Sequence, residues 1–365
     1  MAVDQHARHF RRAQDRGAVM AMISIPDWAA LERRGLLGRL GFLSAVLVFL
    51  TVLTLPLVIP YLWLLVKSFT AEGDPMAMSV LWRSAGIAVL GYAGAVGLTL
   101  VSGRAPAQAW AVLGLVLAGL LALLVVPHLT LENYRFLWTR DIEATGARSD
   151  MMPSIWEAMA TSLAFALGQT IIVTVTAAPA AYALSRFAFV GRETALRGLL
   201  ILHAFPALAL TVAVFVQLWF MGLLNSIWGV MLVMSALELP FTIFVLKSFF
   251  DAAPWDTEMS AVTDGATRFQ AFRMIVLPQV LPGLIAVATF AFLRGWEEYV
   301  FVQTLLLDNE TLTMSLYLFF VAQDSMGADY GLIAAVGVIY LLPVLVLYIF
   351  TQKYITQMNF GGIKG

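Results

Sequence analysis

Charged side chains interrupt the apolar segments of this sequence at two places, where they could do chemistry. Glu238 stands in one segment, and Arg294, Glu297 and Glu298 fall close together in another. Each such charge costs about 2.5–3.5 kcal/mol to insert into a membrane, so each marks a candidate functional site. They could line a polar route for a hydroxyl-rich solute. Alternatively, Arg294 pairs with Glu298 at i, i+4 near the outer interface. For Arg294 we favour the pairing; for Glu238 and Glu297 both interpretations stay open.

Several other kinds of site are excluded by residue type and spacing. Cysteine is absent, so there is no disulfide, thiolate metal site or thiol nucleophile. No two of the four histidines have the i, i+4 spacing of a zinc motif. Only Lys67 and Lys247 precede a serine or threonine, and neither follows the glycine-rich turn of a nucleotide-binding loop. We therefore expect no metal, cofactor or catalytic centre in this chain.

The elements that carry these residues belong to a membrane protein. The chain is 61% hydrophobic and only 12% charged over 365 residues, far from the composition of a soluble domain. Its apolar segments reach the roughly 20 residues of a spanning helix and lack the alternation of barrel strands. We predict an all-α polytopic membrane protein with eight spans, at about 40–66, 84–102, 107–127, 155–184, 199–221, 226–248, 277–300 and 331–351. Gly91, Gly94 and Gly97 of the second span would suit close helix contact; alternatively they are ordinary helix glycines, which membrane spans tolerate.

Basic residues set the orientation of the spans, because lysine and arginine concentrate on the cytoplasmic side. With the N-terminus inside, sixteen of the 22 basic residues fall on the cytoplasmic side and five outside, with Arg294 inside a span. Both termini are therefore expected in the cytoplasm. Residues 1–38 are too polar for a signal peptide, and Met20 or Met22 could be the true start. A lipid-facing arm is expected there rather than a nucleic-acid-binding one.

Residues 251–276 form the most polar long loop in the second half of the chain. Pro254 suits a first helical turn, and Gly265 suits a left-handed helix stop. Thr267 and Gln270 then form a capping-box pattern for a second helix, and Pro278 marks the re-entry into the membrane. The second helix would carry an apolar stripe of Phe269, Phe272 and Ile275. The sequence thus predicts a helical hairpin outside the bilayer that a soluble partner could grip; an ordinary solvated loop is the alternative.

The spacing within this loop resembles the EAA loop of ABC importer permeases, whose pattern is E-A-A-x3-G-x9-I-x-L-P. The residues that match in register are Ala261, Gly265, Ile275, Leu277 and Pro278. Asp264 and Ala266 around the glycine also resemble the carbohydrate-uptake (maltose-type) branch. The front departs from the pattern, since Met259 and Ser260 replace the glutamate and the first alanine. Glu258 stands just before them and is the candidate substitute for the motif glutamate.

Three more segments and the tail extend the resemblance. Residues 130–134 (TLENY) and 182–187 (YALSRF) are similar to motifs of maltose-type permeases. Trp296-Glu297-Glu298-Tyr299 corresponds to their W-N-E-F near the solute path, with Glu297 replacing asparagine. Residues 361–365 (GGIKG) resemble their G-G-V-K-G tail.

The resemblance implies a type I ABC importer permease with six core helices and one half of a solute path. It implies a second related permease, two ATPase subunits that bind ATP and Mg, an external solute-binding protein and a carbohydrate as solute. Some permeases of this branch are longer and handle α-glucosides, so the resemblance favours an α-glucoside as the solute. The implied location is a bacterial or archaeal cytoplasmic (inner) membrane. The loop would be a coupling helix in a cleft of the ATPase, its coupling residues being Glu258, Ala261, Asp264, Gly265, Ala266, Ile275, Leu277 and Pro278. The tail would touch the ATPase through Gly361, Gly362 and Lys364, and the solute pathway would include Glu238, Trp296, Glu297, Glu298 and Tyr299.

The expected organisation places an inserted helix pair after the first core helix. Two extra crossings cancel, so the later topology is kept. The expected segments are an N-terminal arm (1–38), a first helix (39–70), the inserted pair (71–128), an external loop (129–154), a core (155–351) and a C-terminal tail (352–365). The rival function is an ion-coupled secondary carrier with Glu238 and Glu297 as ion sites. An integral membrane enzyme is poorly supported, because no nucleophile–base pair stands out.

Overall fold

The computed structural model describes residues 36–71, 77–102, 106–138, 153–307, 311–323 and 329–355, and these ranges contain helices and loops with no strand. The predicted N-terminal arm and the tail residues Gly361, Gly362 and Lys364 lie outside them. Contacts divide the chain into two units, 1–63 with 78–128 and 64–77 with 129–365. Each unit is described by itself below. Most of the first helix groups with the predicted inserted pair rather than with the core.

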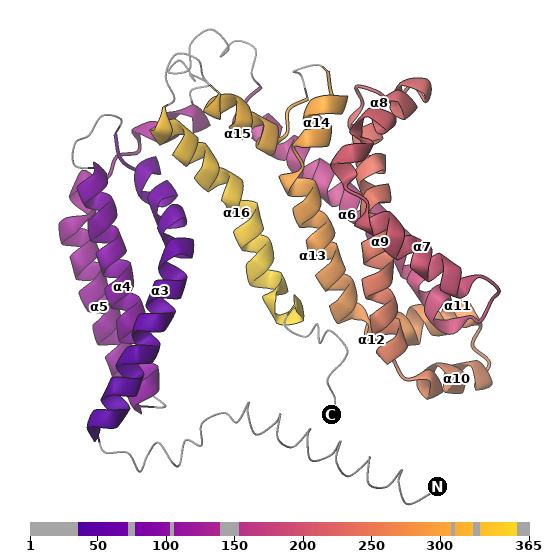
Figure 1. Cartoon of the computed structure of the whole chain (residues 1–365), viewed down its shortest axis with the longest axis horizontal. Coiled ribbons are helices and arrows are strands. Elements are labelled where there is room, and N and C mark those ends of the chain that lie inside the picture. Colours follow the sequence, from indigo (N-terminus) through magenta and orange to yellow (C-terminus); the bar gives the residue numbers. More distant parts are fainter. Residues whose placement is uncertain are drawn as a thin grey trace, which may run out of the picture. The chain divides into compact units, whose positions relative to one another are not determined.

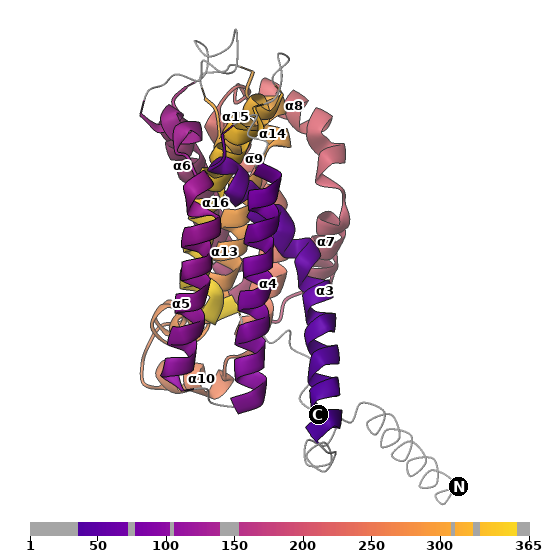
Figure 2. The ribbon, with the colours of Figure 1, turned by 90° about the vertical axis from the view of Figure 1, so that its left-hand side faces the viewer.

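The first unit contains most of α3 (Leu36–Ser68), then α4 (Ala77–Ser102), α5 (Ala107–Leu124) and the 3-10 turn η1 (Val126–His128). Helices α4 and α5 run side by side (Figures 1 and 2). A Cβ on Gly91 would lie 3.0 Å from Leu117, and one on Gly94 would lie 2.7 Å from Leu113. The predicted close contact is thus confirmed at these two glycines. A Cβ on Gly97 would meet no atom of the described residues within 4 Å, so the alternative of an ordinary helix glycine applies there.

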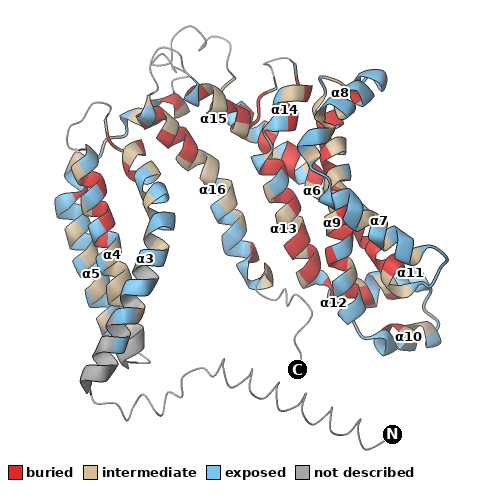
Figure 3. Cartoon of the chain, in the orientation of Figure 1, coloured by how far each residue is buried: buried red, intermediate tan, exposed pale blue. Residues whose placement is uncertain are grey.

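The second unit holds the remaining helices and their short connections. These are η2 (Glu132–Leu137), α6 (Ile155–Arg186), α7 (Arg192–Ala204), η5 (Ala207–Leu210), α8 (Thr211–Phe220), α9 (Ile227–Ala252), α10 (Trp255–Thr263), α11 (Arg268–Ala271), the π turn η6 (Phe272–Val276), α12 (Leu277–Gln279), α13 (Leu281–Glu297), α14 (Val300–Leu305), α15 (Met314–Ala322) and α16 (Tyr330–Ile355). Helices α6, α9 and α13 pack against one another, and α16 packs against α13. Figure 3 shows that buried residues concentrate along α6, α9 and α13. These three helices form the centre of the unit.

Helix α6 is the longest helix of the core, and its ends follow local sequence rules. Ser154 and Glu157 form a reciprocal capping box that satisfies two amide donors at its start. Pro179 lies inside the helix, as spanning helices tolerate. The helix ends where Phe187 takes an extended backbone. The next helix, α7, begins after Gly191, whose φ of 92° is a left-handed conformation that glycine adopts at little cost.

The candidate spans agree only partly with the eight that the sequence predicts. In the described residues five helices are long and apolar enough to cross a membrane, or up to seven if each of two bent pairs is one span. The predicted span 199–221 is broken between α7 and α8, which meet at 88°. Pro206 explains this break, because the residue before a proline disfavours the helical conformation. The count of eight therefore stays a prediction.

The second bend separates residues 268–279 from α13 by 76°. Pro278, which is predicted to mark the re-entry into the membrane, lies within α12, and the break falls two residues later at Val280. The point of re-entry stays a prediction. Pro282 causes the break, since its ring would clash with the carbonyl of Pro278 and it has no N–H to donate.

Hydrogen bonds join the two segments that flank the predicted inserted pair, residues 67–70 and 130–133, and we call this contact the clamp. The Thr130 amide donates to the Phe69 carbonyl at 2.6 Å. The Asn133 amide nitrogen lies 3.3, 3.1 and 2.9 Å from the carbonyl oxygens of Lys67, Ser68 and Thr70. These oxygens stand at the C-terminal end of α3, where helix carbonyls lack partners. The TLENY segment therefore caps the first helix.

Candidate functional site

The polar loop 251–276, called the hairpin below, has the two helices that the sequence predicts. Helix α10 follows Pro254 and ends at Gly265, whose φ is 98°. The amides of Gly265 and Ala266 donate to the carbonyls of Val262 and Ala261, at 3.1 and 3.0 Å. This is a Schellman stop, which needs a left-handed residue at the position of Gly265. Three of the predicted coupling residues thus shape the turn between the two helices.

The second helix of the hairpin begins with the capping box that the sequence predicts. The Thr267 side chain accepts from the Gln270 amide, and the Gln270 side chain accepts from the Thr267 amide. At Phe272, five residues after Thr267, the helix widens into the π turn η6, a feature that often occurs at functional sites. Phe272 packs inward, 4.6 Å from the Tyr182 ring, and its ring lies 6.4 Å from that of Phe269, which is 68% exposed. Phe269 and Phe272 of the predicted apolar stripe are thus neighbours, and the stripe runs from an exposed position to half-buried ones at Phe272 and Ile275.

Glu258 is fully buried at the base of α10, and its carboxylate is enclosed by this chain. The Tyr182 hydroxyl donates to Oε1 at 2.6 Å. Arg186 Nε lies 2.9 Å from Oε2, an ion pair whose N–H direction does not meet hydrogen-bond geometry. Arg268 Nη1 lies 3.6 Å from Oε1. The carboxylate has no exposed surface, so its contacts in this conformation are with this chain, and the role of Glu258 as a substitute for the motif glutamate stays a prediction.

Trp255 completes what we call the Glu258 cluster, which consists of Tyr182, Arg186, Trp255, Glu258 and Arg268. The guanidinium carbon of Arg186 lies 5.3 Å from the Trp255 ring centroid, and that of Arg268 lies 5.7 Å from it. Both distances are typical of cation–π contacts. Only Glu258 of this cluster was a predicted site residue. Tyr182 and Arg186 are spaced i, i+4 and share a face of α6, which is the sequence signal that could have added them.

Further polar contacts fix the end of α6 beside the hairpin. Arg186 also donates to the Ala253 carbonyl at 2.9 Å. The Ser185 hydroxyl donates to Asp251 at 2.6 Å, and Lys247 pairs with the same carboxylate at 2.5 Å. Arg192 Nε donates to the Leu184 carbonyl at 2.7 Å. The last turn of α6 is thereby tied to the end of α9 and to the start of the hairpin.

The exposed residues of the hairpin include large apolar side chains and charges of both signs, Asp256 and Asp264 being among the acids. Trp255, Phe269 and Met274 are exposed by 42, 68 and 69%. Arg268 and Arg273 are exposed beside them. Of the remaining predicted coupling residues, Asp264 and Pro278 are exposed, whereas Ile275 and Leu277 are half-buried. Large apolar side chains in a polar loop mark a surface that fits a protein partner.

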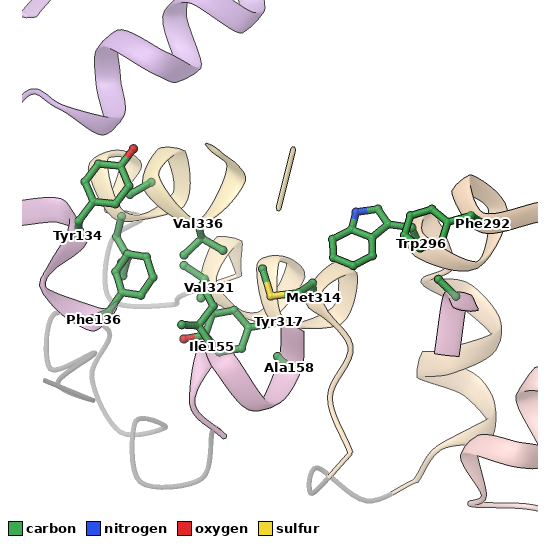
Figure 4. Close-up of a cluster of buried hydrophobic side chains, with 13 residues drawn as sticks. Tyr134, Phe136, Ile155, Ala158, Phe292, Trp296, Met314, Tyr317, Val321 and Val336 are labelled. Carbon is green, nitrogen blue, oxygen red and sulfur yellow. The ribbon is translucent and has the colours of Figure 1, made fainter. Parts of the chain in front are cut away.

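The predicted solute-pathway residues do not share one environment. Trp296 is fully buried, stacks on Phe292 and Tyr340 at 6.0 and 5.6 Å, and donates to the Tyr340 carbonyl at 3.2 Å. Figure 4 shows Trp296 within the buried cluster that α13 shares with α6, α15 and α16. Glu297 is exposed, and Glu238 is half-buried. Trp296 therefore packs inside the protein and presents no free face to a solute in this conformation.

The neighbours of Trp296 correct the favoured pairing of Arg294 with Glu298. No ion pair joins them in the described range 153–307, and Arg294 interacts electrostatically with Glu238 as well as with Glu298. The Glu298 carboxylate accepts from the Phe301 amide at 2.7 Å, because it caps α14. Tyr299 packs on Phe319 at 4.6 Å. Among the described residues no group of three or more His, Asp or Glu could hold a metal ion.

Comparison with known proteins decides the family. The profile described as "Binding-protein-dependent transport system inner membrane component" matches residues 171–357, just over half of the chain. The chain belongs to this family. The match covers the end of α6, the hairpin and all later spans, so the hairpin motif, residues 182–187, residues 296–299 and the Glu258 cluster fall inside it. Members of the family are transport subunits rather than enzymes.

Curated relatives of this permease are subunits of sugar transporters. The trehalose transport system permease protein SugB of Mycobacterium tuberculosis (strain CDC 1551 / Oshkosh) is 29% identical over 66% of this chain and 85% of its own length. The galactooligosaccharides transport system permease protein GanQ of Bacillus subtilis (strain 168) is 31% identical over 66% and 83%. The maltodextrin transport system permease protein MdxG of the same organism is 30% identical over 56% and 74%. The chain is thus a transmembrane permease of a carbohydrate ABC transporter.

A solved structure shares the fold of this permease. It is described as a bacterial ABC transporter involved in the import of the acidic polysaccharide alginate. The TM-score is 0.61 at 18% identity, over 86% of this chain and 96% of the other. At this identity the likeness shows the fold alone. It supports the predicted all-α ABC permease architecture.

Proposed function

We propose that this permease forms half of the solute path of an ATP-driven carbohydrate importer and receives its energy through the hairpin. The observation that carries the proposal is the hairpin itself. It is a compact polar excursion between two apolar helices, it has an exposed apolar and charged surface, and it is fastened to α6 by buried charges. A rigid element of this kind can transmit force between two sites. The basic residues that flank the spans favour a cytoplasmic hairpin.

The partners follow from the proposed mechanism. A second related permease completes the solute path, two ATPase subunits bind ATP and Mg, and an external binding protein delivers the solute. Closure of the ATPases pushes on the hairpin, and the core helices rock so that the path opens outward and then inward. Gly361, Gly362 and Lys364 of the tail are proposed as a further contact with the ATPase. Hydrolysis belongs to the partner subunits.

The proposed solute is a small oligosaccharide, with α-glucosides as the first class to test. The named relatives carry trehalose, maltodextrins or galactooligosaccharides, so trehalose, maltotriose and a galactooligosaccharide are suitable probes. Glu238, Glu297, Glu298 and Tyr299 are proposed to border the polar path, and Trp296 to support its wall from inside.

Substitution of Gly265 tests the coupling role. At its φ of 98°, any side chain is strained, at a cost of about 1–2 kcal/mol. A Cβ would meet no atom within 4 Å in the part of the chain that the structure describes, so the strain stays local. We expect Gly265→Asp to insert normally and to lose most ATP-dependent uptake in proteoliposomes. Gly191→Asp is the matched control, because Gly191 has a φ of 92° and equally open surroundings outside the hairpin. Full uptake by the Gly265 variant would show that the hairpin is not the coupler.

Reconstitution of the chain alone separates this function from an ion-coupled carrier. We expect no uptake of the three probes without the ATPase, whether or not a proton or sodium gradient is applied. Uptake driven by a gradient and indifferent to ATP would instead assign Glu238 and Glu297 as ion sites. Co-purification from gently solubilised membranes identifies the ATPase and the second permease directly.

A further inference from the structure

We propose that Glu258 is a positioning residue that joins the hairpin to α6, so that both move as one body and force enters the core through α6. This inference rests on the proposed function, since it concerns the route of the energy that the hairpin receives. The chain itself connects the hairpin to α9 and α13. The side-chain contacts, however, point to α6, which is more than sixty residues away in sequence.

The first observation is where the contacts fall. Arg186 of α6 reaches three successive points of the hairpin. These are the Ala253 carbonyl before α10, the Trp255 ring at the start of α10 and the Glu258 carboxylate one turn later. Tyr182, one turn earlier on α6, donates to the same carboxylate. One face of α6 therefore holds the first turn of α10.

The second observation is the burial and charge balance of the Glu258 cluster. The carboxylate is fully buried, and the Arg186 side chain is 7% exposed. If α10 moved away from α6, a charge would be left in the interior without its partner, which is strongly unfavourable. Arg268 approaches the same carboxylate from the second helix of the hairpin. One acid thus joins α6, α10 and α11, and separating any of the three is costly.

The third observation is the apolar packing around Tyr182. Its ring lies 5.8 Å from Phe250 of α9 and 4.6 Å from Phe272 in the π turn. These rings belong to a buried cluster that also includes Leu246 and Val276. The cluster continues along α6 into the contacts with α9 and α13. A push on the hairpin would therefore be delivered to the inner end of a helix that extends 32 residues.

The departure from the EAA pattern fits this role. The pattern places its glutamate where this chain has Met259, and the acid stands one residue earlier. One residue turns a side chain by about 100° around a helix. Glu258 faces α6, whereas Met259 lies half-buried with its sulfur 3.6 Å from Arg268 Nη1. The shifted acid therefore serves an internal contact, and the position of the motif acid is left to an uncharged side chain.

The test compares Glu258→Gln with Glu193→Gln in the assembled complex. Glu193 pairs with Arg197 at 3.6 Å, and both side chains are about four-fifths exposed, so the control makes the same substitution in a solvated ion pair. The measured quantity is uptake per ATP hydrolysed in proteoliposomes. The solute is whichever of trehalose, maltotriose and galactooligosaccharide the wild-type complex takes up. We expect Glu258→Gln to retain ATP hydrolysis and to lose about tenfold in uptake per ATP. The control should match the wild type. Unchanged uptake per ATP in Glu258→Gln would overturn the proposal.

A second variant, Tyr182→Phe, tests the proposal even if the Glu258→Gln complex does not assemble. Tyr182→Phe removes one hydroxyl and keeps the ring packing and the ion pair. We expect a smaller loss of uptake per ATP, about threefold, because one hydrogen bond is removed while the ion pair with Arg186 stays in place. Wild-type coupling in an assembled Tyr182→Phe complex would count against the proposal whatever happened to the first variant.

Distances between spin labels give a readout that a merely structural role would not move. The chain has no cysteine, so labels can be attached at introduced cysteines alone. Thr263 on α10, Thr176 on α6 and Gln352 on α16 are exposed positions for them. On ATP binding we expect the 263–176 distance to stay constant while the 263–352 distance changes. If the 263–176 distance changes as much, the hairpin does not move with α6. A wild-type complex without any ATP-driven uptake would instead refute the proposed function itself.

Discussion

The helix pair α4–α5 and the region where α6 meets the hairpin are held together by different means. The pair is joined through glycines that meet leucine side chains, and α5 has no buried residue. The hairpin is joined to α6 through a buried carboxylate, two guanidiniums, a hydroxyl and an indole ring. Packing of small residues is the usual way for helices to associate in lipid, where burial of apolar surface gives no driving force.

The difference indicates which of the two regions can transmit force. A contact made only of packed methyl groups loses little at each small displacement, because every pair of atoms contributes only about 0.1–0.2 kcal/mol. A buried ion pair resists displacement, since one partner cannot move without leaving the other unpaired. The Glu258 cluster therefore fixes a position, whereas the α4–α5 contact only holds two helices side by side. The predictions below test this contrast at single residues and then at the level of segments.

The largest effect is expected where a glycine meets a rigid group. A Cβ on Gly283 of α13 would lie 2.4 Å from the Phe249 ring of α9. We expect Gly283→Ala to destabilise the core by about 1–3 kcal/mol, because the ring must move within a packed contact. The measurement is the melting temperature of the detergent-solubilised chain.

Two glycines of α4 supply graded controls for this variant. Gly94→Ala meets the end of a flexible leucine side chain at 2.7 Å and should cost less than Gly283→Ala. Gly97→Ala meets no atom within 4 Å and should be neutral, or stabilise its helix by up to about 1 kcal/mol. Equal losses for Gly94→Ala and Gly283→Ala would contradict the expectation that a packed ring yields less readily than a flexible leucine.

Sequence patterns could predict the local geometry of the hairpin but not its partners. The left-handed stop at Gly265 and the capping box of Thr267 and Gln270 depend on residues within six positions of one another. The burial of Glu258 depends on Tyr182, 76 residues away, and no spacing rule connects them. The same dependence on distant residues explains the outcome for the predicted pairing of Arg294 with Glu298. Its spacing to Glu298 allowed a pair, but Glu298 caps α14 instead, and Glu238 of α9 also lies near Arg294.

The spans show a related limit. Apolar length placed the spans but could not show that residues 199–221 and 277–300 are bent, because hydropathy does not register a break. Pro206 and Pro282 stand at the two bends, so proline position was the available signal. Trp296 was a pathway candidate by motif, and only packing could show that its ring is enclosed.

A smaller effect is expected at the clamp where the predicted inserted pair joins the core. Asn133→Ala removes three contacts to carbonyl oxygens and should destabilise the core by about 1–2 kcal/mol. Asn133→Asp should be worse, since a carboxylate would face those oxygens without a proton to donate. Glu132→Ala, an exposed neighbour, is the control for the same loop. Melting temperatures in the order Asn133→Ala below Asn133→Asp would show that the amide is not a donor to the helix end.

The smallest effect is expected from the largest change, the excision of residues 72–128 with a short Gly-Ser linker. The Phe69 carbonyl and the Thr130 amide are hydrogen-bonded at 2.6 Å, so the two ends already meet. Removing two crossings keeps the orientation of every later span. We expect the shortened chain to co-purify with the ATPase and to support uptake within about twofold of the wild type, because the hairpin and its contacts with α6 lie wholly in the other unit. The same excision combined with Asn133→Ala should fail, since the clamp then holds neither end. If the excised chain aggregates while Asn133 is intact, the pair belongs to the core and the contrast between the two regions is wrong.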